Sequence, residues 1–187
     1  GNSRHEQHYT ISHPRIKKLI NDIKDRGHEI GLHPSYNTYN DFERLQKEKL
    51  VLESIVGSQI VSGRQHYLRL EVPYTLQYWN DMGMEWDSTL SFADFAGFRC
   101  GVCYPFPVYN FLTRQKLQLI ERPLITMEAS LIGYEKLSNS DCISKQRRLK
   151  SEVQKYNGEF VFLWHNSSFN SDGYMYTDSI LYDLYKT

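Results

Sequence analysis

Helix and strand signals alternate along this chain of 187 residues, and the alternation limits the folds open to it. Apolar residues at helical spacing follow Pro14 and stop at Gly27, and a second helical pattern runs from Asp41 to Val56. Short apolar runs predict strands in the segments HEIGLH, QIVSGRQHYLRLEV, MEWDSTL, LQLIERPLIT and EFVFLWH. Further helices are expected over 73–83 and 141–156. This order predicts an α/β fold with a parallel sheet or barrel.

Composition narrows the class of protein. With 40% hydrophobic and 24% charged residues, one compact domain over residues 1–187 is expected. The 22 Lys and Arg balance the 22 Asp and Glu, so no net charge draws the chain to nucleic acid. No apolar run approaches the roughly 20 residues of a membrane span. The abrupt start at Gly1 suggests natural sequence upstream, and both the bacterial cytoplasm and the cell envelope stay open as compartments.

The stretch from Ser91 to Asn110 is rich in Gly, Pro and aromatic residues, which predicts a long ordered loop with a functional role. It contains Cys100 and Cys103 in a C-x-x-C pattern. A single such pair favours a structural role over zinc or redox chemistry. The 14 tyrosines would suit stacking on sugar rings, although composition alone favours ordinary half-buried packing.

Two histidines, His33 and His165, are expected where strands end. Functional side chains gather at the carboxyl ends of strands in parallel α/β proteins, although a hydrogen-bonded structural histidine is the alternative for either one alone. Asn37 follows His33 by four residues, so one helical turn would bring its carbonyl oxygen beside His33 as a weak metal ligand. A plain Asx turn is an equally good interpretation of Asn37.

The segments GHEIGLHPSYN and FLWHN resemble the polysaccharide deacetylases, carbohydrate esterase family 4. That family has a His-Ser/Thr-x-x-His motif after a GHEIG-type strand. His33 matches the first histidine of this motif, and Asn37 stands at the place of the second. The family's last motif, Leu-x-His, is matched by the run from Leu163 to His165. The resemblance covers most of the chain in order.

Other motifs of the family match more loosely. GRQHYLRLEVPY is similar to the motif that centres on an arginine, with Arg64, His66 and Arg69 as candidates. Alternation along a strand would place Arg64 and His66 on one face and Arg69 on the other. Asp94 is the counterpart of the family's acidic residue beside an aromatic one. The Asp-Asp pair of the first motif has no counterpart, so the resemblance implies a distorted (β/α) barrel that lacks its first strand.

The resemblance also implies roles. A divalent metal, most simply zinc, would be held by His33 and Asn37 and would polarise the acetyl carbonyl. His165 would give a proton to the leaving amine, and Arg69 would position the base. The residues expected to bind substrate are Tyr36, Arg64, His66, Asp94 and Trp164, with ordinary packing as the alternative for Trp164.

The predicted function is therefore a hydrolase that breaks the C–N amide bond of an N-acetylated sugar, such as a unit of a bacterial surface polysaccharide. The alternative is a carbohydrate-binding relative that keeps the barrel without the chemistry. A metal site with one histidine and no acidic partner binds poorly, so this chain by itself is expected to be weakly active or inactive. The edge left by a missing strand would allow pairing with another copy.

Overall fold

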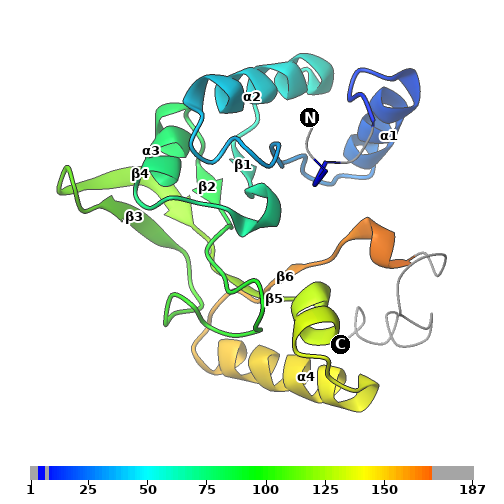
Figure 1. The fold of residues 1–187 in the computed structure, drawn as a ribbon, viewed down its shortest axis with the longest axis vertical. Helices are drawn as coiled ribbons and strands as arrows, with labels where there is room; N and C mark the ends of the chain where they lie inside the picture. The colour runs from blue at the N-terminus through cyan, green and yellow to red at the C-terminus, as the bar shows by residue number, and fades with distance from the viewer. Residues whose placement is uncertain (1–3, 7–8, 170–187) are drawn as a thin grey trace. The chain divides into compact units, whose positions relative to one another are not determined.

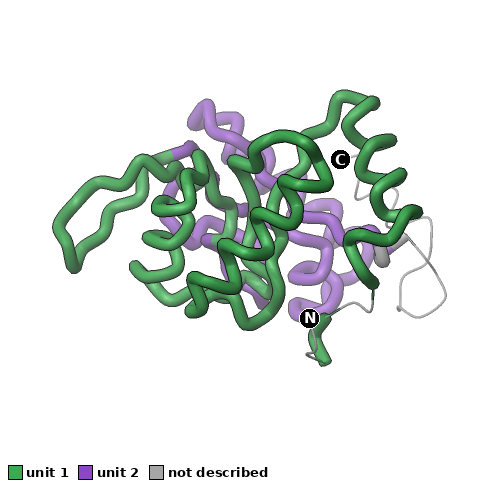
Figure 2. The backbone as a smooth tube through the Cα atoms, turned by 90° about the horizontal axis from the view of Figure 1, so that it is seen from above, with its two compact units in different colours: residues 1–89, 106–121 green, residues 90–105, 122–187 purple. Residues whose placement is uncertain are grey.

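The computed structural model describes residues 4–6 and 9–169, and the chain forms two compact units. Unit 1 comprises residues 1–89 and 106–121, and unit 2 comprises residues 90–105 and 122–187 (Figure 2). The expectation of a single domain over residues 1–187 stays a prediction. The elements of unit 1 (Figure 1) are α1 (Pro14–Asp25), α2 (Phe42–Val56), β1 (Ser62–Gly63), η1 (His66–Leu68), α3 (Tyr74–Asp81), β2 (Trp86–Asp87), β3 (Phe106–Asn110) and β4 (Gln115–Glu121).

The sheet of unit 1 has the order β1-β2-β4-β3. The first three strands are parallel, and β3 pairs antiparallel with β4 at one edge. Helices α1, α2 and α3 contribute to one apolar cluster with β3 and β4, in which Leu45, Trp79 and Leu119 are fully buried. The parallel pairing agrees with the predicted alternation of helix and strand.

The residues at the two ends of helix α2 determine where the helix begins and ends. The Asp41 side chain accepts a hydrogen bond from the backbone N–H of Arg44 at 3.1 Å, which caps the first turn. At the other end Gly57 adopts φ 73°, a left-handed conformation that favours glycine. Asp41 and Gly57 therefore fix a helix that the sequence pattern had placed within one residue of its bounds.

The predicted strand HEIGLH forms only one bridge. Leu32 lies parallel to β1, where its N–H donates to the carbonyl oxygen of Ser62 at 2.8 Å and its own carbonyl accepts from Arg64 N at 2.9 Å. Pro34 has no N–H to extend this ladder. A Cβ at Gly63 would collide with the Leu32 carbonyl, so glycine permits the close approach. His33 therefore follows the strand-like Leu32, as expected, but at the end of a single bridge.

The prediction of strand geometry over residues 64–69 is wrong. The chain leaves β1 and turns through η1, where Tyr67 and Leu68 have φ values of 57° and 53°. Side chains therefore do not alternate here, and the placement of Arg64 and His66 on one face with Arg69 on the other does not apply. Left-handed backbone at two successive non-glycine residues is strained, and such strain is found mostly at functional sites.

Part of the predicted loop over residues 91–110 is a strand. Residues 91–105 lack helix and strand, whereas 106–110 form β3, which pairs with β4 through Phe106 opposite Glu121 and Asn110 opposite Gln115. The aromatic and proline content that predicted a loop hides the alternation of buried Val108 and Asn110 with exposed neighbours.

Unit 2 contains two parallel strands, which pair with each other, and one long helix. Its elements are β5 (Leu124–Met127), η2 (Ala129–Tyr134), α4 (Asn139–Lys155), β6 (Val161–Leu163) and η3 (Asn166–Phe169). Its apolar cluster includes Ile125, Leu131 and Cys142, each fully buried. None of the helices within residues 4–6 and 9–169 has both the length and the apolar character that crossing a membrane requires. The same residues contain the two sheets described above and no closed barrel.

Candidate functional site

Chemically active side chains follow the carboxyl ends of the parallel segments in unit 1. His33 follows the bridge to β1, Arg64 follows β1, and Asp87 and Glu121 are the last residues of β2 and β4. The last residues of β1, β2 and β4 are register partners across the sheet. Because the strands run in the same direction, these residues gather at the edge where α/β proteins place their sites.

The imidazoles of His33 and His66 face each other at this edge. His33 Nε2 lies 3.0 Å from His66 Nδ1. The other nitrogen of each ring meets a carbonyl oxygen: His33 Nδ1 lies 2.8 Å from that of Arg64, and His66 Nε2 lies 2.8 Å from that of His5. Carbonyls only accept, so these two nitrogens carry the protons. In neutral rings both facing nitrogens then have a lone pair, an arrangement that suits a shared proton or a metal ion.

The guanidinium of Arg64 is bonded to Ser88 and interacts electrostatically with a buried acidic pair, Asp87 and Glu121. Its Nε donates to the carbonyl oxygen of Ser88 at 2.6 Å and its Nη2 to Ser88 Oγ at 2.8 Å. Asp87 and Glu121 are 1% and 0% exposed. Burial raises the pKa of Asp87 above its ordinary value, and hydrogen bonds with Thr89 and Glu121 and the charge of Arg64 oppose the rise. Two carboxyl groups hydrogen-bonded to each other share a proton.

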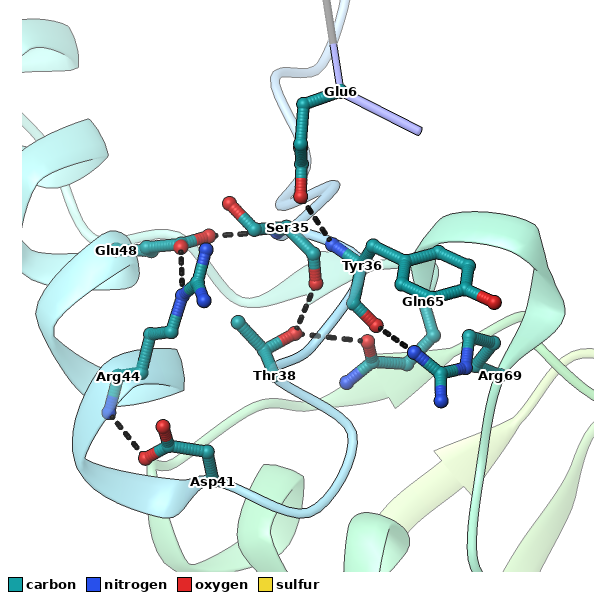
Figure 3. Close-up of polar contacts among 9 residues, drawn as sticks. All are labelled: Glu6, Ser35, Tyr36, Thr38, Asp41, Arg44, Glu48, Gln65 and Arg69. Carbon is teal, nitrogen blue, oxygen red and sulfur yellow. Dashed lines mark hydrogen bonds and ion pairs between the residues drawn. The ribbon is translucent and has the colours of Figure 1, made fainter. Parts of the chain in front are cut away.

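Arg69 lies between two tyrosine rings in unit 1. Its Cζ is 3.8 Å from the ring centroid of Tyr36 and 3.9 Å from that of Tyr39. Its Nη1 donates to the carbonyl oxygen of Tyr36 at 2.7 Å (Figure 3). The same Nη1 donates to Asn37 Oδ1 at 3.1 Å. These contacts fix Tyr36 and Asn37. The predicted metal ligand Asn37 thus has its oxygen engaged by a cation, and a positioning role of Arg69 toward a base has no counterpart in its contacts.

A cavity of about 910 Å³ lies beside the imidazole pair in unit 1, within the range of small-molecule sites. His33 and His66 line it together with Glu6, Arg44 and Glu48. Glu48 is held in place, because it accepts from the backbone N–H of Ser35 at 2.7 Å and from Arg44 Nε at 3.1 Å (Figure 3). The imidazole pair therefore borders a volume large enough for a small-molecule ligand.

In unit 2, His165 is anchored by a buried carboxylate. Glu128 is 1% exposed, and its Oε1 lies 2.6 Å from His165 Nδ1. The same oxygen accepts from the backbone N–H of His165 at 3.2 Å and from Ser168 Oγ at 2.8 Å. A carboxylate on Nδ1 fixes the tautomer, so Nε2 is the nitrogen that takes up or releases a proton. The His165 side chain is 46% exposed, which gives it access to a ligand.

Two predicted substrate-binding residues of unit 2 differ in their surroundings. Trp164 is half-buried, its ring centroid is 5.5 Å from that of Phe162, and it packs against the apolar cluster of unit 2. These contacts favour the packing alternative. Asp94 is exposed in the 91–105 segment. In the same segment Cys103 is buried against Gly158, where a Cβ would collide with Cys103 Sγ, so Cys103 has a packing role.

Four of the polar residues that sequence reasoning missed form the acidic pair of unit 1 or hold His165 in unit 2. Three of them, Glu128, Asp87 and Glu121, are acidic residues at or directly after the end of a short apolar strand. The pattern of an apolar run that ends at a polar residue predicted His165, and it could have predicted these three acids as well. The fourth, Ser168, follows β6 by five residues and carries no such signal.

The residues present fit part of a metal site. In each of the two rings, the nitrogen that faces away from the other ring donates to a carbonyl oxygen. The second nitrogen of a metal-bound histidine usually donates to a carbonyl or carboxylate in the same way. Among residues 4–6 and 9–169, no group of three or more His, Cys, Asp or Glu side chains is arranged to hold an ion. The donors that fit are therefore His33 and His66, two nitrogen ligands of the kind that zinc accepts.

Neither a protein-family model nor a curated protein sequence matches this chain. Solved structures do. A structure from Mycobacterium smegmatis, assigned as a polysaccharide deacetylase, matches 92% of this chain with a TM-score of 0.64 and 17% identity. A second, from Pseudomonas aeruginosa PAO1 and with the same assignment, matches 80% of it with a TM-score of 0.50 and 13% identity.

The chain spans 60% of the first of these structures and 49% of the second. At these identities the likeness establishes the fold. The protein has a mixed α/β fold of the polysaccharide deacetylase type, which confirms the predicted fold class.

Proposed function

We propose, with the polysaccharide deacetylase-like fold as the premise, that the protein hydrolyses the acetamide of an N-acetylated sugar, with His165 as the proton donor. The observation that carries the proposal is the contact between Glu128 and His165 Nδ1 at 2.6 Å. A buried carboxylate stabilises the imidazolium that forms when His165 takes up a proton. Histidine changes its protonation near neutral pH, which suits the transfer of a proton to a leaving amine.

Three hydrogen bonds to one oxygen of Glu128 support the orientation of His165. Glu128 Oε1 accepts from the ring, from the backbone N–H of His165 and from Ser168 Oγ. The ring therefore cannot turn its Nδ1 away without breaking a charge-assisted hydrogen bond. An oriented donor of this kind contributes about 10²- to 10⁴-fold to a hydrolytic rate.

For unit 1 by itself, and independently of His165 in unit 2, we propose a divalent metal site. His33 Nε2 and His66 Nδ1 would hold it, with His66 in the place that the sequence suggested for Asn37. When bound, such an ion polarises a carbonyl and lowers the pKa of water. The carbonyls of Arg64 and His5 keep the two rings in the tautomers that present these nitrogens.

The test is release of acetate from an acetylated oligosaccharide, such as a chitin oligomer, by the purified protein with and without added Zn²⁺. Acetate release that falls at least a hundredfold in His165→Ala, with an unchanged unfolding midpoint, supports the proposal. Equal losses of stability and turnover would show that His165 is structural. The surface variant His28→Ala, whose residue is exposed in unit 1, is the matched control and should keep full activity.

A carbohydrate-binding protein without catalysis is the second candidate, and one observation favours it. Asn37 Oδ1 accepts from the guanidinium of Arg69, so this position is used to hold a loop. Elemental analysis showing no bound metal, together with sugar binding and no acetate release at any Zn²⁺ concentration, would establish this second function.

A further inference from the structure

A short N-terminal segment, residues 4–6, lies on the imidazole and tyrosine side chains of unit 1. The ring of His5 stacks on Tyr36 with centroids 4.3 Å apart and planes inclined by 21°. The carbonyl oxygen of His5 lies 2.8 Å from His66 Nε2. The carboxylate of Glu6 accepts from the backbone N–H of Tyr36 at 2.8 Å (Figure 3). The segment thus presents a flat ring, a carbonyl and a carboxylate to one surface.

The ring of Tyr36 is a fixed platform for such a ligand. Arg69 Cζ lies 3.8 Å from its centroid and His5 lies 4.3 Å from it, so the two groups must occupy opposite faces of the ring. Arg69 also donates a hydrogen bond to the Tyr36 carbonyl oxygen, which holds the guanidinium on its face of the ring. The edge of Tyr67, 5.4 Å from Tyr36 between centroids, borders the platform. Removal of His5 would therefore expose an aromatic face that is already oriented, the usual surface for a sugar ring.

Two neighbouring backbone amides on this loop each bind a carboxylate, but the carboxylates differ in origin. Ser35 N–H donates to Glu48, which belongs to α2 and also pairs with Arg44. Tyr36 N–H donates to Glu6, which belongs to no helix or strand (Figure 3). The Glu48 contact is part of the fold. The Glu6 contact is one that a carboxylate of similar chemistry can replace.

We propose that Tyr36, its backbone N–H and His66 form a subsite for an acidic acetamido sugar, and that residues 4–6 fill this subsite in the ligand-free protein. The sugar ring takes the place of the His5 ring on Tyr36. A carbonyl oxygen of the sugar takes the place of the His5 carbonyl at His66 Nε2, and its carboxylate takes the place of Glu6 at Tyr36 N–H. The acetamide rests on the proposed function, whereas the carboxylate preference goes beyond it.

The test compares two sugars that differ by one carboxylate: N-acetylmuramic acid, which carries it, and N-acetylglucosamine, which lacks it. Binding is measured calorimetrically to the unchanged protein and to Glu6→Gln. We expect N-acetylmuramic acid to bind Glu6→Gln about tenfold more tightly than the unchanged protein, because the ligand no longer displaces a charged hydrogen bond. N-acetylglucosamine should gain less than about threefold, since it does not use the Tyr36 N–H.

Glu43→Gln is the matched control. Glu43 lines the same cavity and undergoes the same chemical change, but it is exposed on α2 and has no contact with the Tyr36 amide. It should leave both affinities unchanged. An equal gain for both sugars in Glu6→Gln, or an equal gain in Glu43→Gln, would overturn the carboxylate subsite.

Displacement of the segment gives a second readout on the unchanged protein. Tryptic cleavage between Arg4 and His5, followed by mass spectrometry, should accelerate when N-acetylmuramic acid saturates the protein and not when N-acetylglucosamine is added. Cleavage that is unaffected by a bound acidic sugar would show that ligand and segment use different places. Both readouts are independent of turnover: binding with this preference but without acetate release would contradict only the proposed function, and acetate release without the preference would contradict only this subsite.

Discussion

His33 and His165 each follow an apolar segment, yet their surroundings differ in the group that meets Nδ1. His165 Nδ1 lies 2.6 Å from the carboxylate of buried Glu128, whereas His33 Nδ1 lies 2.8 Å from the carbonyl oxygen of Arg64. A carboxylate stabilises a protonated ring by charge. A carbonyl fixes the tautomer without supplying a full charge. Similar sequence positions therefore prepare one histidine to carry a proton and the other to present a lone pair.

The two histidines also differ in the surroundings of their second ring nitrogen, Nε2, and in exposure. His33 Nε2 faces His66 Nδ1 at 3.0 Å beside a cavity in unit 1, so it is one of two donors directed at the same place. His165 belongs to unit 2, and its side chain is 46% exposed. The proposed roles are therefore ligand holding for His33 and proton transfer for His165, and each proposal can be tested separately.

The largest effect is expected from Glu128→Gln. The amide keeps the size of the side chain but removes the charge that stabilises protonated His165, and it can present an N–H in place of an acceptor. Turnover should fall about a thousandfold, or about 4 kcal/mol of activation free energy, while metal binding stays unchanged. The measurement is acetate release under saturating substrate, with thermal unfolding to confirm that the fold is kept.

Ser168→Ala is the control for this change. Ser168 donates to the same oxygen at 2.8 Å but carries no charge, so its loss should lower turnover less than about tenfold. If Ser168→Ala and Glu128→Gln lower turnover equally, packing around β6 rather than the carboxylate supports His165.

The second prediction concerns the imidazole pair. His33→Gln and His66→Gln should each weaken Zn²⁺ binding about a hundredfold, because each removes one of two nitrogen donors. His165→Gln should leave Zn²⁺ affinity unchanged. Calorimetric titration of the protein with Zn²⁺ measures these affinities without any turnover. A loss in Asn37→Ala as large as that in His33→Gln would restore Asn37 as the ligand.

The sequence allowed the prediction of those elements whose signals are local. Helix α2 was placed correctly because Asp41 caps its first turn and Gly57 ends it in a left-handed conformation. The strand that precedes His165 was found because an apolar run ends abruptly at a polar residue. Such signals require only neighbouring residues, so a single chain reveals them.

The partners of the site residues could not be predicted, because they depend on pairing between distant segments. His66 meets His33 only because Leu32 lies beside Gly63 and the chain then turns through η1. Glu128 meets His165 only because β5 and β6 pair in parallel, with Met127 opposite Leu163. The expectation of alternation from Arg64 to Arg69 failed for the same reason: tertiary contacts hold Tyr67 in a conformation that no local propensity favours.

The smallest effect is expected from the buried acidic pair, Asp87 and Glu121, and it tests whether Asp87 is protonated in the folded protein. Burial raises the pKa of Asp87 against the opposing contacts with Thr89, Glu121 and Arg64. An acid whose pKa is raised on folding binds more protons in the folded state, so its contribution to stability is complete at low pH and is lost as pH rises through the folded pKa. Because asparagine does not ionise, Asp87→Asn does not lose this contribution to stability as the pH rises.

The free energy of unfolding of Asp87→Asn should therefore improve relative to the unchanged protein as the pH rises from 4 toward neutrality, by at most about 1.4 kcal/mol per pH unit. Urea unfolding at several pH values measures the difference. Asp81→Asn, at an exposed position at the end of α3, is the matched control for the chemical change itself. If the Asp87→Asn difference instead worsens as pH rises, Asp87 is ionised in the folded protein and the charge of Arg64 stabilises it. The carboxyl edge of the unit 1 sheet would then hold a fixed negative charge.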